Sequence, residues 1–379
     1  MTIEKKIRVL IVDDSALMRR IIMTSLLKHD DIDVVGTAAN GLLALEAIKK
    51  TKPDVITLDV EMPEMDGIET LKEIRKTNSA LHIIMFSTTT QLGTRVTIDA
   101  LTHGANDYVS KPNDISNIQD AYQLLENTLI PKIKALYGSV VASSIKDRGV
   151  ARREQMPPSV TEKTISLETK SYSSSSSEVN RIKNRPLYPV AAVCIGVSTG
   201  GPEALKCMFA LWRSPLSVPI FIVQHMMPKF ITILAARLSE IGVIQVQEPY
   251  EGQEALPGLA YIAPGGFHMV LKRSGTKVFI SLNEDPPENS CRPAVDVLFR
   301  SAAQVYGRSL LAVVLTGMGY DGLKGAQEVV ASNGVVIAQD KETSVIWGMP
   351  GAIVEADLAE KTLPIDQIPN EILFRTTLK

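Results

Sequence analysis

The chain has 379 residues, of which 45% are hydrophobic and 22% charged, and its formal net charge is −2. This length predicts two or three domains, and the balanced composition excludes a wholly disordered, collagen-like or coiled-coil protein. The three scattered cysteines do not form a disulfide framework or a zinc motif, so we expect a reducing compartment and place the protein in the cytoplasm. No apolar run reaches the roughly 18 residues of a membrane span, and the first residues lack the cleavage site of a signal peptide.

From residue 7 to about residue 135, short apolar runs alternate with segments of helical periodicity. The apolar runs cover residues 7–12, 54–58, 82–86 and 107–109, and the helical spacing occurs after Ser15, at 41–50 and at 67–76. This repetition predicts a parallel sheet with helices on both faces, that is, a flavodoxin-like (βα)5 domain over residues 1–130. In such folds the functional residues lie at the carboxyl ends of the strands.

Residues 131–189 differ in composition. Apolar runs become sparse, and Tyr172 is followed by five serines. A Ser-rich polar segment cannot bury enough apolar surface to offset its chain entropy. We therefore interpret residues 131–189 as a linker whose first turn completes the preceding helix. The linker is basic, with a net charge of +6 between two acidic domains.

From residue 190 the alternation resumes, and it predicts a second, doubly wound α/β domain over residues 190–379. The expected strands cover residues 190–195, 218–224, 258–263, 269–271, 278–282, 310–315 and 335–338, and the expected helices cover 202–212, 229–241, 294–305 and 321–332. We expect a mixed sheet with an inserted β-hairpin near residues 258–282.

Three acids follow strand ends in the first domain. Asp13 and Asp14 follow the first strand, and Asp59 ends the third. Because these ends are neighbours in a parallel sheet, the carboxylates should converge and favour a hard cation such as Mg²⁺. Ser87 and Lys111 follow two further strands and complete a set suited to phosphoryl transfer onto Asp59. The alternative is that such acids cap helices or face solvent.

The second domain opens with a candidate nucleophile. Its first strand leads into Gly196-x-Ser198-x-Gly200, and Pro202 then begins a helix. This turn puts the Ser198 hydroxyl near a helix N-terminus, which can stabilise an oxyanion. The same context also suits a nucleotide-binding glycine loop, which needs an acid at the end of the next strand. That strand ends in His225, which favours a serine–histidine pair.

Two histidines of the second domain can serve as the base. His225 ends the strand beside that of Ser198, whereas His268 begins a later strand. A base also needs an acid to fix its tautomer, and Asp321 follows a glycine-rich turn after another apolar strand. From spacing alone, Asp321 could equally cap the helix that it precedes.

The first domain resembles the receiver domain of bacterial two-component response regulators. The matching residues are Asp13-Asp14, Asp59, Met62-Pro63, Met65-Asp66-Gly67, Ser87, Tyr108 and Lys111-Pro112. The resemblance implies that a histidine kinase phosphorylates Asp59 and that Ser87, Tyr108 and Lys111 act as the switch. It also implies a Mg²⁺ ion held by Asp13, Asp14, Asp59 and the backbone carbonyl of Glu61.

The second domain resembles the catalytic domain of the chemotaxis protein-glutamate methylesterases. The matching blocks are residues 195–201, 224–226, 261–265, 292–299, 315–322 and 347–350. The resemblance implies a Ser198/His225/Asp321 triad that demethylates glutamyl methyl esters and deamidates glutamines on methyl-accepting chemotaxis receptors, with no cofactor for hydrolysis. We place oxyanion donors or site neighbours at Thr199, Gly200, Met318 and His268.

The sequence argues against two other functions of the second domain. A DNA-binding output is disfavoured because residues 190–379 carry a net charge of −3 and no basic recognition helix. A nucleotide-binding module does not account for the six matching blocks. We therefore expect receptors and a histidine kinase as partners, no nucleic acid and no membrane insertion. We also expect the unphosphorylated receiver to cover the Ser198 edge of the catalytic domain.

Overall fold

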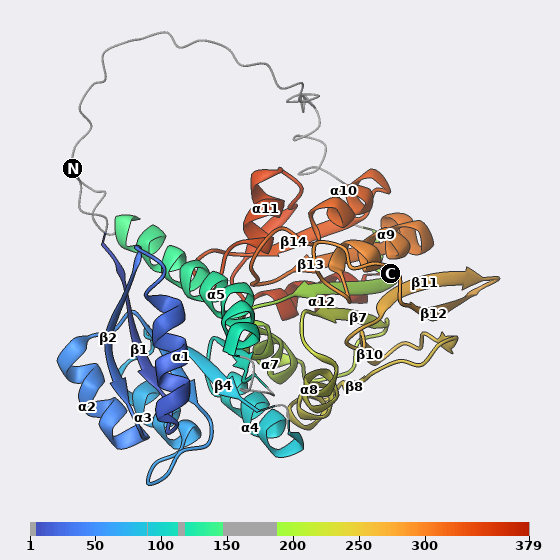
Figure 1. The fold of residues 1–379 in the computed structure, drawn as a ribbon. Helices are drawn as coiled ribbons and strands as arrows, with labels where there is room; N and C mark the ends of the chain where they lie inside the picture. The colour runs from blue at the N-terminus through green and yellow to red at the C-terminus, as the bar shows by residue number, and fades with distance from the viewer. Residues whose placement is uncertain (1–4, 89, 113–117, 147–187, 379) are drawn as a thin grey trace, which may run out of the picture.

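The computed structural model describes residues 5–88, 90–112, 118–146 and 188–378, which form two α/β domains side by side (Figure 1). The first has a parallel sheet in the order β2-β1-β3-β4-β5, the order of flavodoxin-like folds. Its strands are β1 (Ile7–Val12), β2 (Ile32–Ala38), β3 (Val55–Asp59), β4 (His82–Ser87) and β5 (Asp107–Ser110). Its helices are α1 (Ala16–Leu26), α2 (Gly41–Thr51), α3 (Gly67–Thr77), α4 (Gln91–Thr102) and α5 (Ile118–Lys146). The predicted fold class is confirmed.

Local signals explain why several of these elements begin where they do. Ser15 caps α1 by accepting a hydrogen bond from the N–H of Met18, and Asp66 and Glu69 form a capping box on α3. Strand β2 was not assigned from the sequence. It lies at the edge of the sheet and is mostly half-buried, so its apolar pattern is weak.

The helix before the predicted linker extends further into it than the single turn that we expected. Helix α5 continues through Pro131 to Lys146, because Ile133 and Leu136 are fully buried in the receiver core. A proline inside a helix normally marks a break, and burial of the following apolar residues outweighs it here. The Ser-rich segment 173–177 and the rest of the predicted linker up to residue 187 lie outside the described residues.

The second domain is built on a seven-stranded sheet in the order β15-β14-β13-β6-β7-β10-β8. Its strands are β6 (Ala192–Val197), β7 (Ile220–Gln224), β8 (Gln245–Gln247), β10 (Leu259–Ile262), β13 (Leu310–Val314), β14 (Val335–Gln339) and β15 (Lys361–Leu363). Every pairing in this sheet is parallel, so the expected mixed sheet is wrong. The chain proceeds from β6 in one direction and later returns to β13 on the other side. Strand β6 therefore marks the point at which the strand order reverses, where doubly wound folds place their sites.

The inserted hairpin forms a separate antiparallel sheet. It consists of β9 (Gln253–Glu254), β11 (His268–Ser274) and β12 (Lys277–Asn283), and it projects from the domain (Figure 1). The helices of this domain are α7 (Gly201–Leu211), α8 (Pro228–Ile241), α9 (Val295–Tyr306), α10 (Leu323–Ala331), α11 (Met349–Glu355) and α12 (Ile368–Thr377). Of these elements, β8, β9, β15, α11 and α12 were not predicted; the three strands are too short to give a periodic signal.

The two domains contact each other through α4 of the receiver, which packs against α7 and α8 (Figure 1). A second contact involves Ile346 of the catalytic domain, which is buried in the cluster formed by α1, α5 and the receiver strands.

Among the described helices, none combines the length and apolar character that a membrane span requires.

Candidate active site and phosphorylation site

Ser198 lies at the turn between β6 and α7, and its backbone is held on both sides. Its N–H donates to the carbonyl of Thr316 (3.0 Å), and its own carbonyl accepts from the N–H of Gly201 (2.8 Å) and from the Gln224 amide (3.0 Å). Gly200 has φ +79°, and a Cβ there would lie 2.6 Å from a neighbouring side chain. The turn therefore requires glycine, and it leaves the Ser198 side chain half-buried at the sheet edge.

His225 follows β7, the strand paired with β6. Its N–H donates to the carbonyl of Val197 (3.1 Å), so Ser198 and His225 follow neighbouring strand ends. Its Nε2 lies 2.8 Å from Oδ2 of Asp321. Burial alone would lower the pKa of His225, but the hydrogen bond with Asp321 and the nearby Cys291 thiol raise it to about 9.

Asp321 lies after β13, the other neighbour of β6, and its carboxylate is fixed by several donors. These are the N–H groups of Val295 (2.7 Å), Asp296 (3.0 Å) and Gly322 (3.0 Å) and the side-chain amide of Asn289 (2.8 Å). Burial by itself would raise the pKa of Asp321, but the hydrogen bonds from His225 and from the N-terminus of α9 lower it. The carboxylate thus pairs with His225 and caps α9, whereas the alternative was that it caps the helix that follows it, α10.

The three predicted triad residues therefore follow three adjacent strands, β13, β6 and β7. Among the described residues, His225 is hydrogen-bonded to Asp321, but the Ser198 hydroxyl and His225 are not hydrogen-bonded to each other. A nucleophile–base hydrogen bond often tightens only in the complex with substrate. The transfer of the Ser198 proton to His225 remains a prediction.

The predicted oxyanion donors have different environments. The Gly200 N–H donates to the carbonyl of Asn106 in the receiver (3.1 Å), and the Thr199 hydroxyl donates to Oδ2 of Asp107 (2.6 Å). Both groups are thus engaged at the domain interface. Met318 lies in the loop after β13 and is 41% exposed. Among the described residues, its N–H has no recorded acceptor, which leaves that group available for an oxyanion.

His268 occupies a structural position. It is buried, its Nδ1 accepts from the N–H of Ala294 (3.2 Å), and its Nε2 lies 3.2 Å from the carbonyl of Pro286. Both ring nitrogens are therefore used to join the start of β11 to the segment that precedes α9. His268 supports the residues that hold Asp321, and it offers no free nitrogen to an oxyanion.

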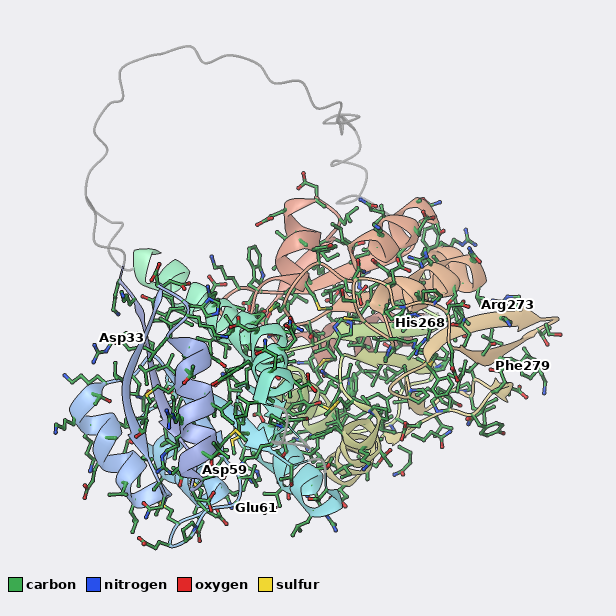
Figure 2. The ribbon with its side chains drawn as sticks, viewed as in Figure 1. Asp33, Asp59, Glu61, His268, Arg273 and Phe279 are labelled. Carbon is green, nitrogen blue, oxygen red and sulfur yellow. The ribbon has the colours of Figure 1, made fainter. Side chains whose placement is uncertain are left out.

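The receiver carries a compact acidic site at the ends of β1 and β3. Carboxylate oxygens of Asp13, Asp14 and Asp59 lie within 4.8 Å of one another, and Lys111 Nζ lies 3.0 Å from Asp13 and 2.7 Å from Asp59. Asp59 and Glu61 lie close together, and the Glu61 N–H is 3.4 Å from Asp59 Oδ1 (Figure 2). Burial, followed by the charge of Asp13, raises the pKa of Asp59 to about 6.

These residues fit a hard divalent cation. The Oδ2 atoms of Asp13 and Asp59 are buried and, among the described residues, accept no hydrogen bond of good geometry, although Lys111 is within ion-pair distance. Buried carboxylate oxygens with unused lone pairs are what Mg²⁺ binds. The predicted ligands Asp13, Asp14 and Asp59 are thus brought together.

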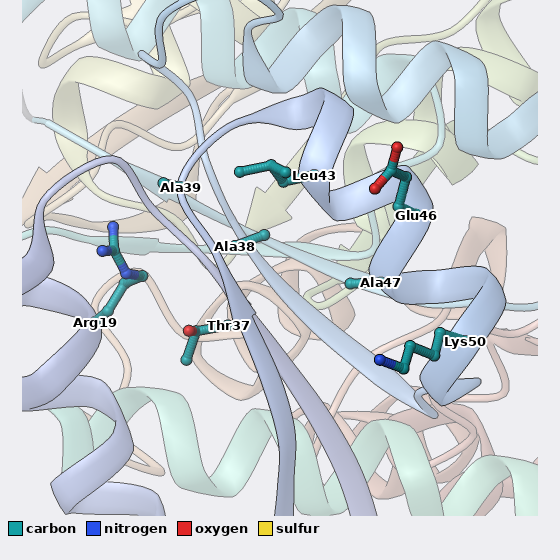
Figure 3. A pocket seen from close by; sticks show the side chains of 8 residues that line it. All are labelled: Arg19, Thr37, Ala38, Ala39, Leu43, Glu46, Ala47 and Lys50. Carbon is teal, nitrogen blue, oxygen red and sulfur yellow. The ribbon is translucent and has the colours of Figure 1, made fainter.

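A cavity of about 400 Å³ lies between α1 and α2. Its lining includes Arg19, Leu43 and Lys50, and none of the triad residues (Figure 3). The Arg19 guanidinium donates to the carbonyls of Asp13 (2.6 Å) and Asp14 (3.0 Å). Arg19 therefore holds the loop that carries these acids.

The predicted switch residues connect the acidic site to the domain interface. The Ser87 hydroxyl is buried and donates to the carbonyl of Gly93 at the start of α4 (3.1 Å). The Tyr108 ring is buried and stacks on Phe230 of α8, with ring centroids 4.3 Å apart. Its hydroxyl accepts from the N–H of Met227 (3.3 Å), two residues after His225.

The first domain carries three clustered acids at its strand ends, and the second carries a serine, a histidine and a buried aspartate at three adjacent strand ends. Together these features define the class of response-regulator hydrolases. Comparison with known families agrees. Residues 9–123 match the response regulator receiver domain, and residues 193–372 match the CheB methylesterase family.

Two relatives match the chain over nearly its whole length. The chain is 45% identical over 370 residues to a protein-glutamate methylesterase/protein-glutamine glutaminase of Trichodesmium erythraeum, covering 98% of this chain and 99% of the relative. A protein of the same name from Nocardioides is 43% identical, with 97% of this chain and 95% of the relative covered. The crystal structure of the Thermotoga maritima CheB methylesterase catalytic domain is 43% identical and covers 49% of this chain and 99% of that domain, with a TM-score of 0.48. The chain belongs to the protein-glutamate methylesterase/protein-glutamine glutaminase family of enzymes.

Sequence reasoning missed several residues around these sites. Asn289 and Cys291 contact the His225–Asp321 pair from a turn that is remote in sequence, and Asn106 and Phe230 join the two domains. Cys291 directly precedes the matching block 292–299, and this position is the signal in the sequence that could have pointed to it. The interface contacts leave no local pattern.

Proposed function

We propose that this enzyme is a phosphorylation-regulated serine hydrolase of the cytoplasm. It demethylates glutamyl methyl esters, and deamidates glutamines, on methyl-accepting chemotaxis receptors, and so serves sensory adaptation. The observation that carries the proposal is the 2.8 Å hydrogen bond between His225 and the buried Asp321, at the strand ends on either side of the one that presents Ser198.

In the proposed reaction, His225 accepts the proton of the Ser198 hydroxyl as its oxygen attacks the γ-carbonyl carbon of the ester. Asp321 orients the imidazole and stabilises its charged form. The N–H of Met318 binds the oxyanion. His225 returns the proton to the leaving methanol, and a water molecule then hydrolyses the acyl-enzyme to release the glutamate side chain. With glutamine as substrate, the leaving group is ammonia.

Regulation rests on the domain interface. Asp107 of the receiver contacts Thr199, the residue after Ser198, and Tyr108 contacts Met227, two residues after His225. A receiver in this position limits access of a receptor to the serine. Phosphorylation of Asp59 by the chemotaxis histidine kinase draws Ser87 toward the phosphoryl group and moves Tyr108, which shifts the domain equilibrium toward an open state.

Asp13, Asp14 and Asp59, with the backbone carbonyl of Glu61, are the residues that would hold Mg²⁺ in the receiver. When bound, the cation supplies positive charge that offsets the phosphoryl oxygens. Asp59 is the acceptor of the phosphoryl group, and Lys111 Nζ lies 2.7 Å from its carboxylate. Hydrolysis in the catalytic domain requires no cofactor.

Methanol release from methylated receptor membranes tests the proposal. The wild-type chain should release methanol, and a phosphodonor should increase the rate. Ser198→Ala should abolish release with and without the phosphodonor, because the nucleophile is gone. Release by this variant at the wild-type rate would exclude Ser198 as the nucleophile.

A further inference from the structure

Cys291 lies beside the catalytic pair but has no part in the proposed reaction. Its Sγ, a ring nitrogen of His225 and a carboxylate oxygen of Asp321 all lie within 4.8 Å of one another. We propose that these three side chains form a binding site for Zn²⁺ or a similar borderline-soft divalent cation, and that occupancy of this site inhibits the hydrolase.

The ligand set suits zinc. Around one tetrahedral zinc ion, sulfur, nitrogen and oxygen ligands at about 2.0–2.3 Å from the metal are separated by roughly 3–4 Å. The three side chains therefore need only small movements to bind. Three protein ligands leave a fourth position for water or for a group of the substrate. The thiolate and imidazole also favour zinc over Mg²⁺, which prefers the all-oxygen site of the receiver.

The turn that carries Cys291 is rigid. Glu288 and Cys291 exchange two backbone hydrogen bonds (3.1 and 2.9 Å), and the two residues between them, Asn289 and Ser290, both have positive φ. This geometry is that of a tight two-residue hairpin turn. The Glu288 carboxylate makes two hydrogen bonds to the Arg300 guanidinium of α9 (2.7 and 2.6 Å), which fix the turn to the helix.

The Asp321 carboxylate is also held in place by neighbouring groups. Asp321 accepts hydrogen bonds from the N–H groups at the start of α9 and from the Asn289 amide, so its carboxylate is oriented before any metal arrives. Such outer-shell bonds raise the affinity of metal sites. The site is also reachable, because Cys291 is half-buried and the His225 side chain is 12% exposed.

A metal ion shared by His225 and Asp321 takes the place of their 2.8 Å hydrogen bond and binds one ring nitrogen of His225. The other ring nitrogen of the neutral imidazole then carries the ring proton, so His225 has no lone pair with which to accept the proton of Ser198. Zinc should thus inhibit hydrolysis, and a chelator should restore it. This consequence rests on the proposed function, whereas metal binding itself does not. A spectroscopic test of binding therefore separates failure of the zinc site from failure of the esterase proposal.

The test uses the full-length chain with excess Mg²⁺, which fills the receiver site, and Co²⁺ as a spectroscopic substitute for Zn²⁺. One equivalent of Co²⁺ should produce a thiolate-to-cobalt charge-transfer band that Zn²⁺ abolishes. Cys291→Ser should lose the band and weaken zinc binding by at least about 100-fold, since loss of an outer-shell partner alone costs about 10–100-fold. Cys207→Ser is the matched control, because this half-buried cysteine lies on α7, outside the cluster, and its loss should change neither result.

A second measurement requires no substitution. Zinc should protect Cys291 from alkylation by iodoacetamide in the wild-type chain and leave the reactivity of Cys207 unchanged, as read by peptide mass spectrometry. Absence of the charge-transfer band, equal zinc affinity in Cys291→Ser, or unprotected alkylation of Cys291 would each overturn the proposal.

Discussion

The hydroxyl of Thr199 donates a 2.6 Å hydrogen bond to Oδ2 of Asp107, and this bond joins the residue after the candidate nucleophile to the first residue of the last receiver strand. The other oxygen of Asp107 lies 2.7 Å from Lys132 Nζ and 2.7 Å from the N–H of Tyr108. One buried carboxylate therefore connects the nucleophile turn, the candidate aromatic switch and α5. A change in the position of β5 must disturb all three contacts together.

Asp107→Asn should raise the activity of the unphosphorylated enzyme. The substitution removes the charge that strengthens the bond from Thr199 and retains an oxygen for Lys132 and Tyr108. Replacing a charge-assisted hydrogen bond with a neutral one costs about 1 kcal/mol, which corresponds to a roughly fivefold shift toward the open state. Methanol release without a phosphodonor measures this rise.

Asp99→Asn provides the matched control for that variant. Asp99 lies at the same interface, but its contact with Arg237 is 3.6 Å long and half-exposed, and such pairs contribute little. The control should keep the basal rate of the wild type. If Asp107→Asn behaves like Asp99→Asn, the Thr199–Asp107 bond does not restrain the enzyme.

Two substitutions at Tyr108 should separate its ring from its hydroxyl. Tyr108→Phe keeps the stack on Phe230 and loses only a 3.3 Å hydrogen bond, so it should stay close to the wild type. Tyr108→Ala removes the ring, whose stacking contributes about 0.5–1.5 kcal/mol beyond its burial. This variant should therefore show a higher basal rate and a smaller stimulation by a phosphodonor. Equal stimulation in both variants would mean that the ring does not transmit the signal.

The rate of hydrolysis should rise with pH up to about 9. The hydrogen bond with Asp321 and the nearby Cys291 raise the pKa of His225 to about 9 against the effect of burial. The proposed base must be neutral to accept a proton, so it is inactive below its pKa and becomes active as the pH passes through it. A profile of kcat/KM against pH measures this rise, which we call the alkaline-rising limb of the profile.

Asp321→Asn should move that limb to lower pH, because the carboxylate no longer favours the charged imidazole. The rate itself should fall by about 10⁴-fold, the size of loss seen when the aspartate of a serine-protease triad is changed to asparagine. If the limb of this variant stays near pH 9, a group other than His225 determines the profile.

Asp59→Asn should separate the role of Asp59 as phosphoryl acceptor from the effect of its buried charge on the stability of the receiver. The variant cannot accept a phosphoryl group, so a phosphodonor should no longer stimulate hydrolysis. Burial raises the pKa of Asp59 from 3.8 to about 6, so ionisation of this carboxyl destabilises the fold progressively as the pH rises between these two values, and in full above them. At pH 7 without Mg²⁺, Asp59→Asn should therefore increase the stability of the receiver, by on the order of 1 kcal/mol.

Thermal unfolding with and without Mg²⁺ checks this expectation. Added Mg²⁺ should raise the unfolding midpoint of the wild type more than that of Asp59→Asn, because the variant lacks one carboxylate of the cluster. An equal effect of Mg²⁺ on both would argue against Asp59 as a ligand.

Much of the fold could be predicted because burial leaves a periodic signal. Strands such as β6 and β13 are buried on both faces and appear as continuous apolar runs. Edge strands such as β2 and β15 are half-buried or exposed, so their pattern is weak. Helix α5 extends further beyond Pro131 than the expected single turn, because its stability there comes from tertiary packing of Ile133 and Leu136.

By itself, the sequence determined which residues end the strands, and parallel pairing then brings Asp13 near Asp59 and Ser198 near His225. Only the tertiary structure decided the rest. Strand order placed Asp321 beside His225, a remote turn added Asn289 and Cys291, and domain packing set Asp107 and Tyr108 against the catalytic loops. The physical reason is that these contacts join segments far apart in the chain. Such segments come into contact only once the domains have folded, so no local pattern in the sequence marks them.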